Sequence, residues 1–572
     1  MKKKLIPVLL AIVLIVVIAA IAFGGSLIDR FSYSKERADL NSYYGLEAQD
    51  DIAIVLQDEI VEEKAKLIDG VCYFDLPTVE KYFTDRFYVN TQEQVLLYTT
   101  ATDVIRINIG DESNVIYISG VGNSIDYRAA LYEGDTLYIA ADYVKRYANL
   151  EYILYDAPLH MQVYISWGLV TQAELTKKTA IRYQGGVKSN ILEDVEAGDT
   201  VTILEENWTK VKSQDAYIGY VENKYLSDKT AVQQTPVTDA MEITYNSLSK
   251  EGTVNMAFHQ VFAEAANSEL SSLLGASKAV NVVAPVWFRL NDNAGGFASI
   301  ASASYVQQAH NAGVDVWAVI TDVDSKSVYD VDIDFEALLS SSQNRANLIA
   351  NLMQQADTYG LDGINIDFEK VRDGAGSHFV QFLRELSIET HKRGIVLSVD
   401  NYVPTEYTAH YNRKEQGLVV DYVVVMGYDE YYAGCGEAGP NASITYVENG
   451  IAKTKESVPA EKIINAVPFY TRVWESTGEG PKASTLTMAQ QAAWVSNSGT
   501  EPVWLDEYCQ NYVEYQKDGN TIQCWLEDTD SIRVKLQVMK AQGIAGVAEW
   551  KLGIEDRAVW DVIEKYVNGT LE

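Results

Sequence analysis

The residues best suited to chemistry lie in one short stretch, residues 361–369. The stretch predicts a β-strand in which Asn365, Asp367 and Glu369 alternate with apolar residues, so the three polar side chains share one face. Polar side chains inside a protein cost free energy unless they are paired or used. A carboxyl group in a partly dry place, close to another carboxyl group, has a raised pKa and suits general acid catalysis. The alternative is a polar layer with satisfied hydrogen bonds in a protein without catalytic activity.

The region around this stretch predicts an α/β fold, a (β/α)8 TIM barrel over residues 251–572. Near-continuous apolar strands alternate there with amphipathic helices such as 344–359 and 377–393, which indicates a parallel sheet covered by helices. In a barrel, Glu369 would lie at the C-terminal mouth of the fourth strand, where barrel enzymes keep their active sites. A hairpin centred on residues 518–519 is expected before the last strand. The eight expected strands are 254–261, 279–288, 314–321, 363–368, 395–399, 422–426, 463–468 and 544–549.

Four motifs of this region resemble the signature of glycoside hydrolase family 18, the chitinase-like enzymes. Their order along the chain matches strands four, six, seven and eight of the family's barrel. Within the family the likeness is greatest to the bacterial spore-cortex and cell-wall branch. The four motifs are Asp362-Gly363 with Asp367 and Glu369; Met426-Gly427-Tyr428-Asp429; Pro468-Phe469-Tyr470 with Arg472 and Trp474; and Gly546-Val547-Ala548-Glu549-Trp550.

The resemblance implies a retaining glycosidase whose nucleophile is the substrate's own 2-acetamido group, an exception to ordinary two-carboxylate chemistry. It implies that Glu369 protonates the glycosidic oxygen and that Asp367 accepts the acetamido N–H. Tyr428 is implied to donate a hydrogen bond to the acetamido carbonyl oxygen. The residues implied to bind the sugar are Asn365, Asp429, Trp550, Tyr470, Arg472 and Met426, with Trp550 stacking under the ring.

Asn365 departs from the family's pattern, which has Asp at this position. An Asp there would share a proton with the next carboxylate, because like charges at that distance do not both ionise easily. Asn cannot ionise, but we expect its amide to donate a hydrogen bond to Asp367. Activity is therefore expected, but its pH dependence does not follow from the family's pattern. Because Asp367 and Glu369 are both present, we do not expect a degenerate, sugar-binding barrel.

The N-terminus predicts export from the cytoplasm. Lys2, Lys3 and Lys4 precede the unbroken apolar run 5–23, which is about as long as a membrane-spanning helix. We expect a membrane anchor in residues 1–27; a signal peptide cleaved after Ala22 is the alternative. Both interpretations place the rest of the chain outside the cytoplasm, either anchored by a single pass or secreted.

Two small modules are expected between this segment and the barrel, with a polar stalk at residues 28–50. Residues 28–168 are expected to form one domain, which after the stalk resembles the copper amine oxidase N-terminal-like α+β domain and contains a weak repeat in which 73–82 aligns with 138–147. Residues 169–227 resemble a bacterial SH3-like domain, an all-β module that often binds cell-wall peptides. Residues 228–250 read as a linker. The alternative for the first module is a passive spacer. The alternative for the second is a small barrel whose aromatic residues only form its core and bind no ligand.

The amino-acid composition argues against several classes of partner and cofactor. With 80 acidic and 46 basic residues the formal net charge is −34, so nucleic acid is not an expected partner. Four cysteines and six scattered histidines predict neither a disulfide scaffold nor a metal site, and no cofactor is expected. The family resemblance implies an enzyme that cleaves β-1,4 bonds next to N-acetylglucosamine, and the expected anchor and wall-binding module favour peptidoglycan of the bacterial cell wall as the substrate. The alternatives are a noncatalytic wall-binding protein and a chitinase acting on external chitin.

Overall fold

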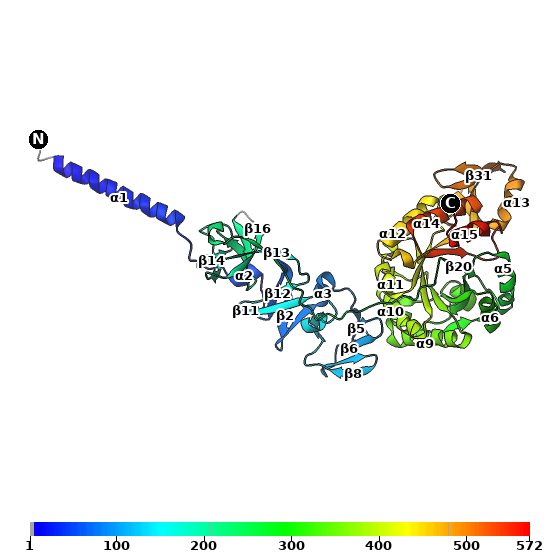
Figure 1. Cartoon of the computed structure of the whole chain (residues 1–572), viewed down its shortest axis with the longest axis horizontal. Helices are drawn as coiled ribbons and strands as arrows, with labels where there is room; N and C mark the ends of the chain where they lie inside the picture. Colours follow the sequence, from blue (N-terminus) through cyan, green and yellow to red (C-terminus); the bar gives the residue numbers. More distant parts are fainter. Residues whose placement is uncertain (1–4, 206–207, 479) are drawn as a thin grey trace. The chain divides into compact units, whose positions relative to one another are not determined.

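The computed structural model of the protein describes residues 5–205, 208–478 and 480–572 (Figure 1). The chain divides into two compact units. Unit 1 runs to Glu242, apart from two short segments, Asn90–Glu93 and Leu97–Ile105. Those segments belong to unit 2, together with Ile243–Glu572.

The core of unit 2 is a closed ring of eight parallel strands, as the sequence predicts. The first strand pairs with both the second and the eighth, which closes the barrel. The strands, in chain order, are β20 (Val254–His259), β21 (Val282–Leu290), β23 (Asp315–Thr321), β24 (Gly363–Asp367), β25 (Val396–Tyr402), β26 (Tyr422–Met426), β27 (Ile463–Pro468) and β33 (Gly546–Trp550). A short strand, β22 (Phe297–Ser299), pairs antiparallel with β21.

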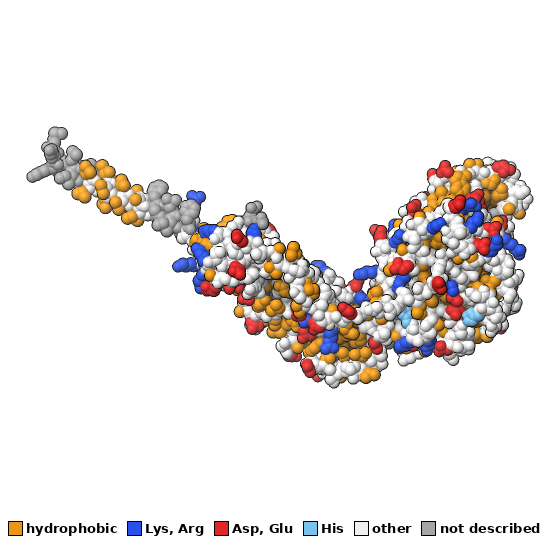
Figure 2. All heavy atoms as spheres, viewed as in Figure 1, with side chains coloured by type: hydrophobic (Ala, Val, Ile, Leu, Met, Phe, Trp, Pro, Cys, Tyr) orange, Lys and Arg blue, Asp and Glu red, His pale blue; other side chains and the backbone are white. Residues whose placement is uncertain are grey.

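Helices surround the ring of strands, and the predicted helices 344–359 and 377–393 are present (Figure 1). Each of these two helices ends at a glycine, Gly360 or Gly394, in the left-handed conformation that favours this residue. The helices are α5 (Leu270–Ala276), α6 (Ala303–Asn311), α7 (Ser325–Tyr329), α8 (Phe335–Ser340), α9 (Ser342–Tyr359), α10 (Gly376–Arg393), α11 (Arg413–Val419), α12 (Ile444–Lys455), α14 (Thr529–Gln542) and α15 (Val559–Val567). On the face in view in Figure 2, acidic and basic side chains are intermixed over the barrel.

An additional sheet is inserted between β27 and β33. The expected hairpin is present, with Lys517 paired to Asn520 around the turn at Asp518 and Gly519. The α-helix α13 (Met488–Ser498) follows the second strand of this sheet. The strands of the inserted sheet are β28 (Tyr470–Thr477), β29 (Gly480–Thr487), β30 (Val503–Leu505), β31 (Gln510–Lys517) and β32 (Asn520–Trp525).

The first part of unit 1 contains the predicted repeat. In each copy a strand runs directly into a helix: β3 (Val71–Asp75) into α3 (Leu76–Tyr82), and β10 (Thr136–Ala140) into α4 (Ala141–Val144). The two strands pair antiparallel within a seven-stranded sheet. The other strands of this sheet are β1 (Asp51–Leu56), β2 (Glu59–Ile68), β9 (Ala130–Glu133), β11 (Glu151–Asp156) and β12 (Leu159–Tyr164). A second sheet contains β4 (Tyr88–Asn90), β5 (Val95–Thr99), β6 (Val104–Asn108), β7 (Val115–Ile118) and β8 (Val121–Ser124).

The strands expected in residues 169–227 are also present, in another seven-stranded antiparallel sheet. This sheet takes in part of the expected linker, because β19 (Thr230–Gln233) pairs with β13 (Leu169–Glu174). The identities of the two small modules and the predicted domain boundaries stay predictions. The remaining strands are β14 (Thr179–Arg182), β15 (Ile191–Val195), β16 (Thr200–Glu205), β17 (Thr209–Lys212) and β18 (Ile218–Val221).

The predicted stalk at 28–50 is wrong for its second half. The short helix α2 (Leu40–Tyr44) buries Tyr44 in a core that it shares with Ile181 and Val211 of the β13–β19 sheet. Its neighbour Tyr43 accepts a hydrogen bond from the backbone of Ile218. Tyr44, although it lies in a polar segment, therefore completes a hydrophobic core. Its partners are far away in the sequence, so the residues around Tyr44 show no pattern that would predict this contact.

The N-terminal apolar run forms the helix α1 (Leu5–Phe31). Lys2, Lys3 and Lys4 lie outside the described residues. Among the residues that the structure describes, no helix has the length and apolar character needed to cross a membrane. The expected membrane anchor therefore has no support from the structure.

Candidate active site

The alternation predicted for β24 is present. Ile364, Ile366 and Phe368 pack into the hydrophobic cluster between the strands and the helices. Asn365 and Asp367 lie on the opposite, inward face and are buried. The strand ends at Asp367, and Glu369 follows two residues later at the carboxyl end of the barrel, where it is half-buried.

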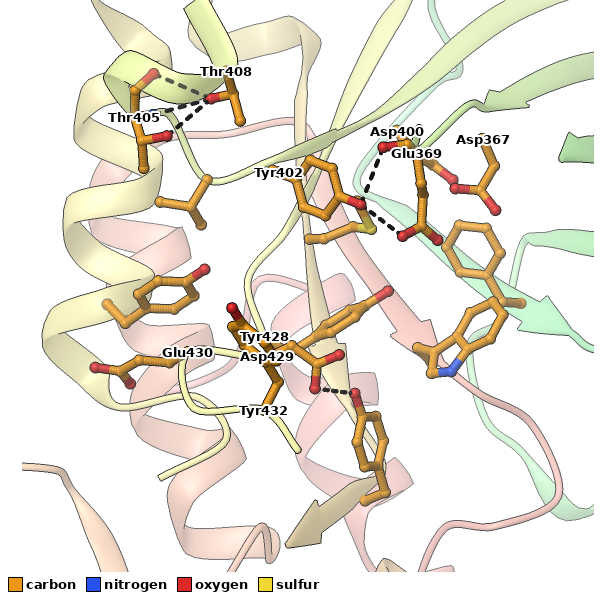
Figure 3. A pocket seen from close by; sticks show the side chains of 16 residues that line it. Asp367, Glu369, Asp400, Tyr402, Thr405, Thr408, Tyr428, Asp429, Glu430 and Tyr432 are labelled. Carbon is orange, nitrogen blue, oxygen red and sulfur yellow. Dashed lines mark hydrogen bonds between the residues drawn. The ribbon is translucent and has the colours of Figure 1, made fainter. Parts of the chain in front are cut away.

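A cavity of about 790 Å³ opens at this end of the barrel (Figure 3). Its volume falls within the roughly 300–1,000 Å³ typical of small-molecule sites. Carboxyl groups and aromatic rings line it together, a combination that can both bind and protonate a sugar. The carboxyl groups come from Asp367, Glu369, Asp400, Asp429 and Glu430, and the rings from Phe258, Tyr402, Tyr428, Tyr432, Tyr446, Tyr470 and Trp550.

Glu369 is held by three neighbouring elements. The Oδ1 atom of Asp322, directly after β23, accepts a hydrogen bond from the Glu369 backbone N–H at 2.7 Å. The Tyr411 hydroxyl donates to the Phe368 carbonyl oxygen at 2.9 Å. The Tyr402 hydroxyl, from the end of β25, donates to the Glu369 Oε2 atom at 2.8 Å. The backbone and the carboxyl group of Glu369 are therefore both fixed at the mouth of the cavity.

Burial and crowding of carboxyl groups raise the pKa values in this row. Burial, followed by the charges of Asp400 and Glu369, raises the pKa of Asp367 well above its usual range. Burial also raises the pKa of Glu369; the hydrogen bond from Tyr402 opposes this rise, and the charge of Asp322 adds to it. The row therefore favours a protonated Glu369 at a higher pH than an exposed glutamate would, as a general acid requires.

The expected hydrogen bond from Asn365 to Asp367 is wrong. The Asn365 amide donates instead to the Asp400 Oδ1 atom at 2.8 Å and to the Ser398 hydroxyl at 3.0 Å. Both acceptors belong to the next strand, β25, on which Asn365 pairs with Ser398. The expected partner belonged to the same row on β24, whereas a partner on a neighbouring strand depends on the register between the strands.

Asp429 lies at the other side of the cavity and is oriented by the residues that follow β27. The Tyr470 hydroxyl donates to its Oδ1 atom at 2.7 Å, and Arg472 Nη2 donates to the same atom at 2.5 Å. Asp429 itself has a positive φ of 58°, a conformation that Asp tolerates better than most residues. Arg472 thus acts on the site through Asp429 and does not itself line the cavity.

The structure brings seven of the nine predicted site residues to the cavity. These are Glu369, Asp367, Tyr428, Asp429, Trp550, Tyr470 and Met426. Asn365 and Arg472 lie behind it and contact the lining residues Asp400 and Asp429. Asp400 and Tyr402 line the cavity but were not predicted, although Ser398, Asp400 and Tyr402 alternate along β25 as the polar residues do on β24. In the described part of the chain, no group of three or more His, Cys, Asp or Glu side chains could hold a metal ion.

Comparison with known proteins agrees with this geometry. The sequence profile of glycosyl hydrolases family 18 matches residues 216–555, more than half of the chain. The chain is 27% identical over 242 residues to the cortical fragment-lytic enzyme of Bacillus subtilis, and the match covers 40% of this chain and 56% of that enzyme. It is 26% identical over 260 residues to the class V chitinase CHIT5 of Lotus japonicus, covering 38% of this chain and 63% of that one. Each match spans less than two thirds of the relative's length.

A solved structure shares the fold. The C-terminal domain of a chitinase-like protein from Desulfitobacterium hafniense superposes with a TM-score of 0.51 at 18% identity. The superposition covers 56% of this chain and all of that domain. At this identity the likeness concerns the fold alone.

Proposed function

The chain belongs to glycosyl hydrolases family 18 and is a glycosidase, and from this premise we propose that it cleaves β-1,4 bonds next to N-acetylglucosamine in peptidoglycan. One observation carries the proposal: the carboxyl ends of three strands, β24, β26 and β33, bring Asp367, Glu369, Tyr428 and Trp550 to a single cavity at the mouth of the barrel. Peptidoglycan is favoured over chitin because several relatives are named cortical fragment-lytic enzymes. The wall-binding module predicted at 169–227 also favours it. We further propose that the enzyme acts outside the cytoplasm.

In the proposed reaction the enzyme supplies acid, orientation and stacking. Glu369 gives its proton to the glycosidic oxygen as the bond to the leaving sugar breaks. The carbonyl oxygen of the substrate's 2-acetamido group attacks the anomeric carbon and forms an oxazolinium ion. Asp367 accepts the acetamido N–H and stabilises the positive charge that develops on the ring.

The remaining residues keep the sugar in the reactive position. Tyr428 donates a hydrogen bond to the acetamido carbonyl oxygen, and Trp550 stacks against the apolar face of the sugar. Asp429, oriented by Tyr470 and Arg472, hydrogen-bonds the substrate beside Tyr428. In the second half of the reaction Glu369 acts as a base on water, which opens the oxazolinium ion with retained configuration.

The proposal is tested by incubating the purified full chain with peptidoglycan and, separately, with chitin oligomers. The products are identified by mass, with the Glu369→Gln variant as the matched control. Fragments ending in intact N-acetylglucosamine from peptidoglycan, absent with the variant, are the expected result. Products from chitin oligomers alone would make the protein a chitinase, and binding of both glycans without any product would make it a noncatalytic wall-binding protein.

A further inference from the structure

The row of polar residues on β24 has a carboxyl neighbour on β25. Asn365 pairs with Ser398 and Ile366 with Val399, so the same register places Asp367 beside Asp400. Both carboxyl groups line the cavity, and Figure 3 shows Asp400 close to Glu369 and Asp367. Parallel strands lie roughly 4.8 Å apart, so side chains on one face at neighbouring positions interact directly.

Asp367 has two requirements that conflict. In a buried site with other carboxyl groups it holds a proton before the substrate arrives, because two adjacent carboxylates do not both ionise easily. To accept the acetamido N–H, however, it must lose that proton. Asn365, the neighbour on its own strand, carries an amide and cannot take the proton. The proton of Asp367 must therefore pass to Glu369 or to a carboxyl group outside β24. Glu369 must itself stay protonated to act as the acid, which leaves a carboxyl group on another element.

Asp400 meets the geometric requirements of a proton acceptor. Only 5% of its surface is exposed, and its Oδ1 atom accepts a hydrogen bond from Asn365 Nδ2 at 2.8 Å. That hydrogen bond favours the ionised form of Asp400. Asp367 receives nothing from Asn365; its own side-chain hydrogen bond is with Thr321. We propose that Asp400 is a further catalytic residue, which takes the proton from Asp367 when Asp367 accepts the substrate's acetamido N–H.

The transfer is balanced without another reactant. One Asp367 O–H bond breaks, one Asp400 O–H bond forms, and the net charge of the site stays constant. The titratable groups that face Asp400 are Asp367 at the end of β24, Glu369 two residues after it, Tyr428 two residues after the end of β26, and Tyr402 on the same strand as Asp400. Burial raises the pKa of Asp400 to about 8, against the lowering effect of the Asn365 hydrogen bond. Burial raises the pKa of Asp367 as well, so the two carboxyl groups hold one proton between them, and the Asn365 hydrogen bond places the negative charge on Asp400.

The inference rests on the proposed substrate-assisted reaction and is tested with Asp400→Asn, which keeps the shape and can still accept the hydrogen bond from Asn365. In this variant Asp367 must release its proton to solvent. We expect kcat/KM at pH 7 to fall toward the lower end of the ~10²–10⁴-fold range seen on loss of a proton-transfer group. The ratio of wild-type to variant kcat/KM should shrink as the pH rises, because a growing fraction of Asp367 then ionises directly. The ratio is taken below the alkaline limbs of both proteins, where Glu369 stays protonated, because the charges of Glu369 and Asp400 influence each other.

The double variant Asn365→Asp/Asp400→Asn moves the carboxyl group back onto β24. It should recover most of the lost activity and remove the pH dependence of the ratio. An unchanged rate in Asp400→Asn, a loss that is independent of pH, or a double variant as slow as the single one would each overturn the proposal. A loss independent of pH would mean that Asp400 has only a structural role.

A second measurement separates this inference from the proposed function. Binding of an N-acetylglucosamine oligomer is measured by calorimetry in two buffers that differ in ionisation enthalpy. Wild-type protein should bind without releasing a proton, since the proton passes to Asp400, whereas Asp400→Asn should release one to the buffer. This difference is readable even if wild-type protein cleaves nothing, which would contradict the proposed function alone. Equal proton release by the two proteins would contradict the role of Asp400.

Discussion

The hydroxyl group of Tyr402 lies 2.8 Å from the Oε2 atom of Glu369 and joins the end of β25 to the carboxyl group at the end of β24. The hydroxyl group donates, so the hydrogen bond stabilises the ionised form of Glu369 and opposes the rise of its pKa. Tyr402 thus sets the pH range over which Glu369 keeps its proton, and it fixes the direction in which the carboxyl group points.

Tyr402→Phe should move the alkaline limb of the activity profile to higher pH. Without the hydroxyl group the ionised form of Glu369 loses a donor, so the pKa of Glu369 rises further. A general acid is active while protonated, and the limb where activity is lost therefore shifts upward. The check is kcat/KM against pH for wild type and variant. A limb that stays in place or moves to lower pH would show that Glu369 is not the group whose deprotonation ends activity.

Glu369→Gln should abolish turnover while preserving sugar binding. Gln has nearly the same shape but no proton to donate, so the rate should fall by at least the ~10²–10⁴-fold typical of a lost general acid. Turnover of an unactivated glycan and binding of an N-acetylglucosamine oligomer are measured side by side. Turnover at the wild-type rate would remove Glu369 from its role, and loss of binding would show that the substitution disturbs more than the proton.

The sequence predicted the strands of the barrel better than the contacts between side chains of neighbouring strands in the site. The apolar strands and the inward row on β24 follow from local alternation, and both are present. Asp400 and Tyr402 were missed because the fifth strand was predicted to end at residue 399, where its apolar residues stop; the structure continues it to Tyr402. The contact of Asn365 with Asp400 depends on the register between two strands, which no local pattern contains. The burial of Tyr44 depends in the same way on partners more than a hundred residues away.

Gly546→Ala should destabilise the barrel where its last strand begins. A Cβ atom at this position would lie 2.0 Å from the backbone carbonyl oxygen of Val254 on the first strand. The backbones of β20 and β33 cannot move apart without opening the barrel. We therefore expect the free energy of unfolding to fall by about 1–3 kcal/mol or more.

Gly275→Ala is the matched control for that measurement. Gly275 lies in α5, and a Cβ atom there meets no heavy atom within 4 Å. Alanine should stabilise this helix by about 0.5–1 kcal/mol relative to glycine. The denaturant midpoints of both variants are compared with wild type. Equal midpoints for Gly546→Ala and wild type would mean that the first and last strands are not joined as tightly as described.

The identity of the nucleophile gives the most demanding prediction. If the nucleophile belongs to the substrate, glycans that lack the 2-acetamido group at the cleavage site should not be cleaved, because Asp367, Tyr428 and Trp550 then have no reactive group to orient. A stable thiazoline that resembles the oxazolinium ion should bind far more tightly than the parent sugar, since it resembles the state that the site stabilises.

Asp367→Ala separates this mechanism from ordinary two-carboxylate chemistry. The positive charge on the ring exists only along the reaction path, so the variant should lose more affinity for the thiazoline than for plain substrate. Affinities for both ligands are measured by calorimetry, and cleavage of acetylated and deacetylated glycans is compared by mass. In ordinary two-carboxylate chemistry a carboxylate of the enzyme attacks the sugar. A glycosyl group trapped covalently on Asp367 or Glu369, or ready cleavage of the deacetylated glycan, would therefore assign the attack on the sugar to the enzyme and not to its substrate.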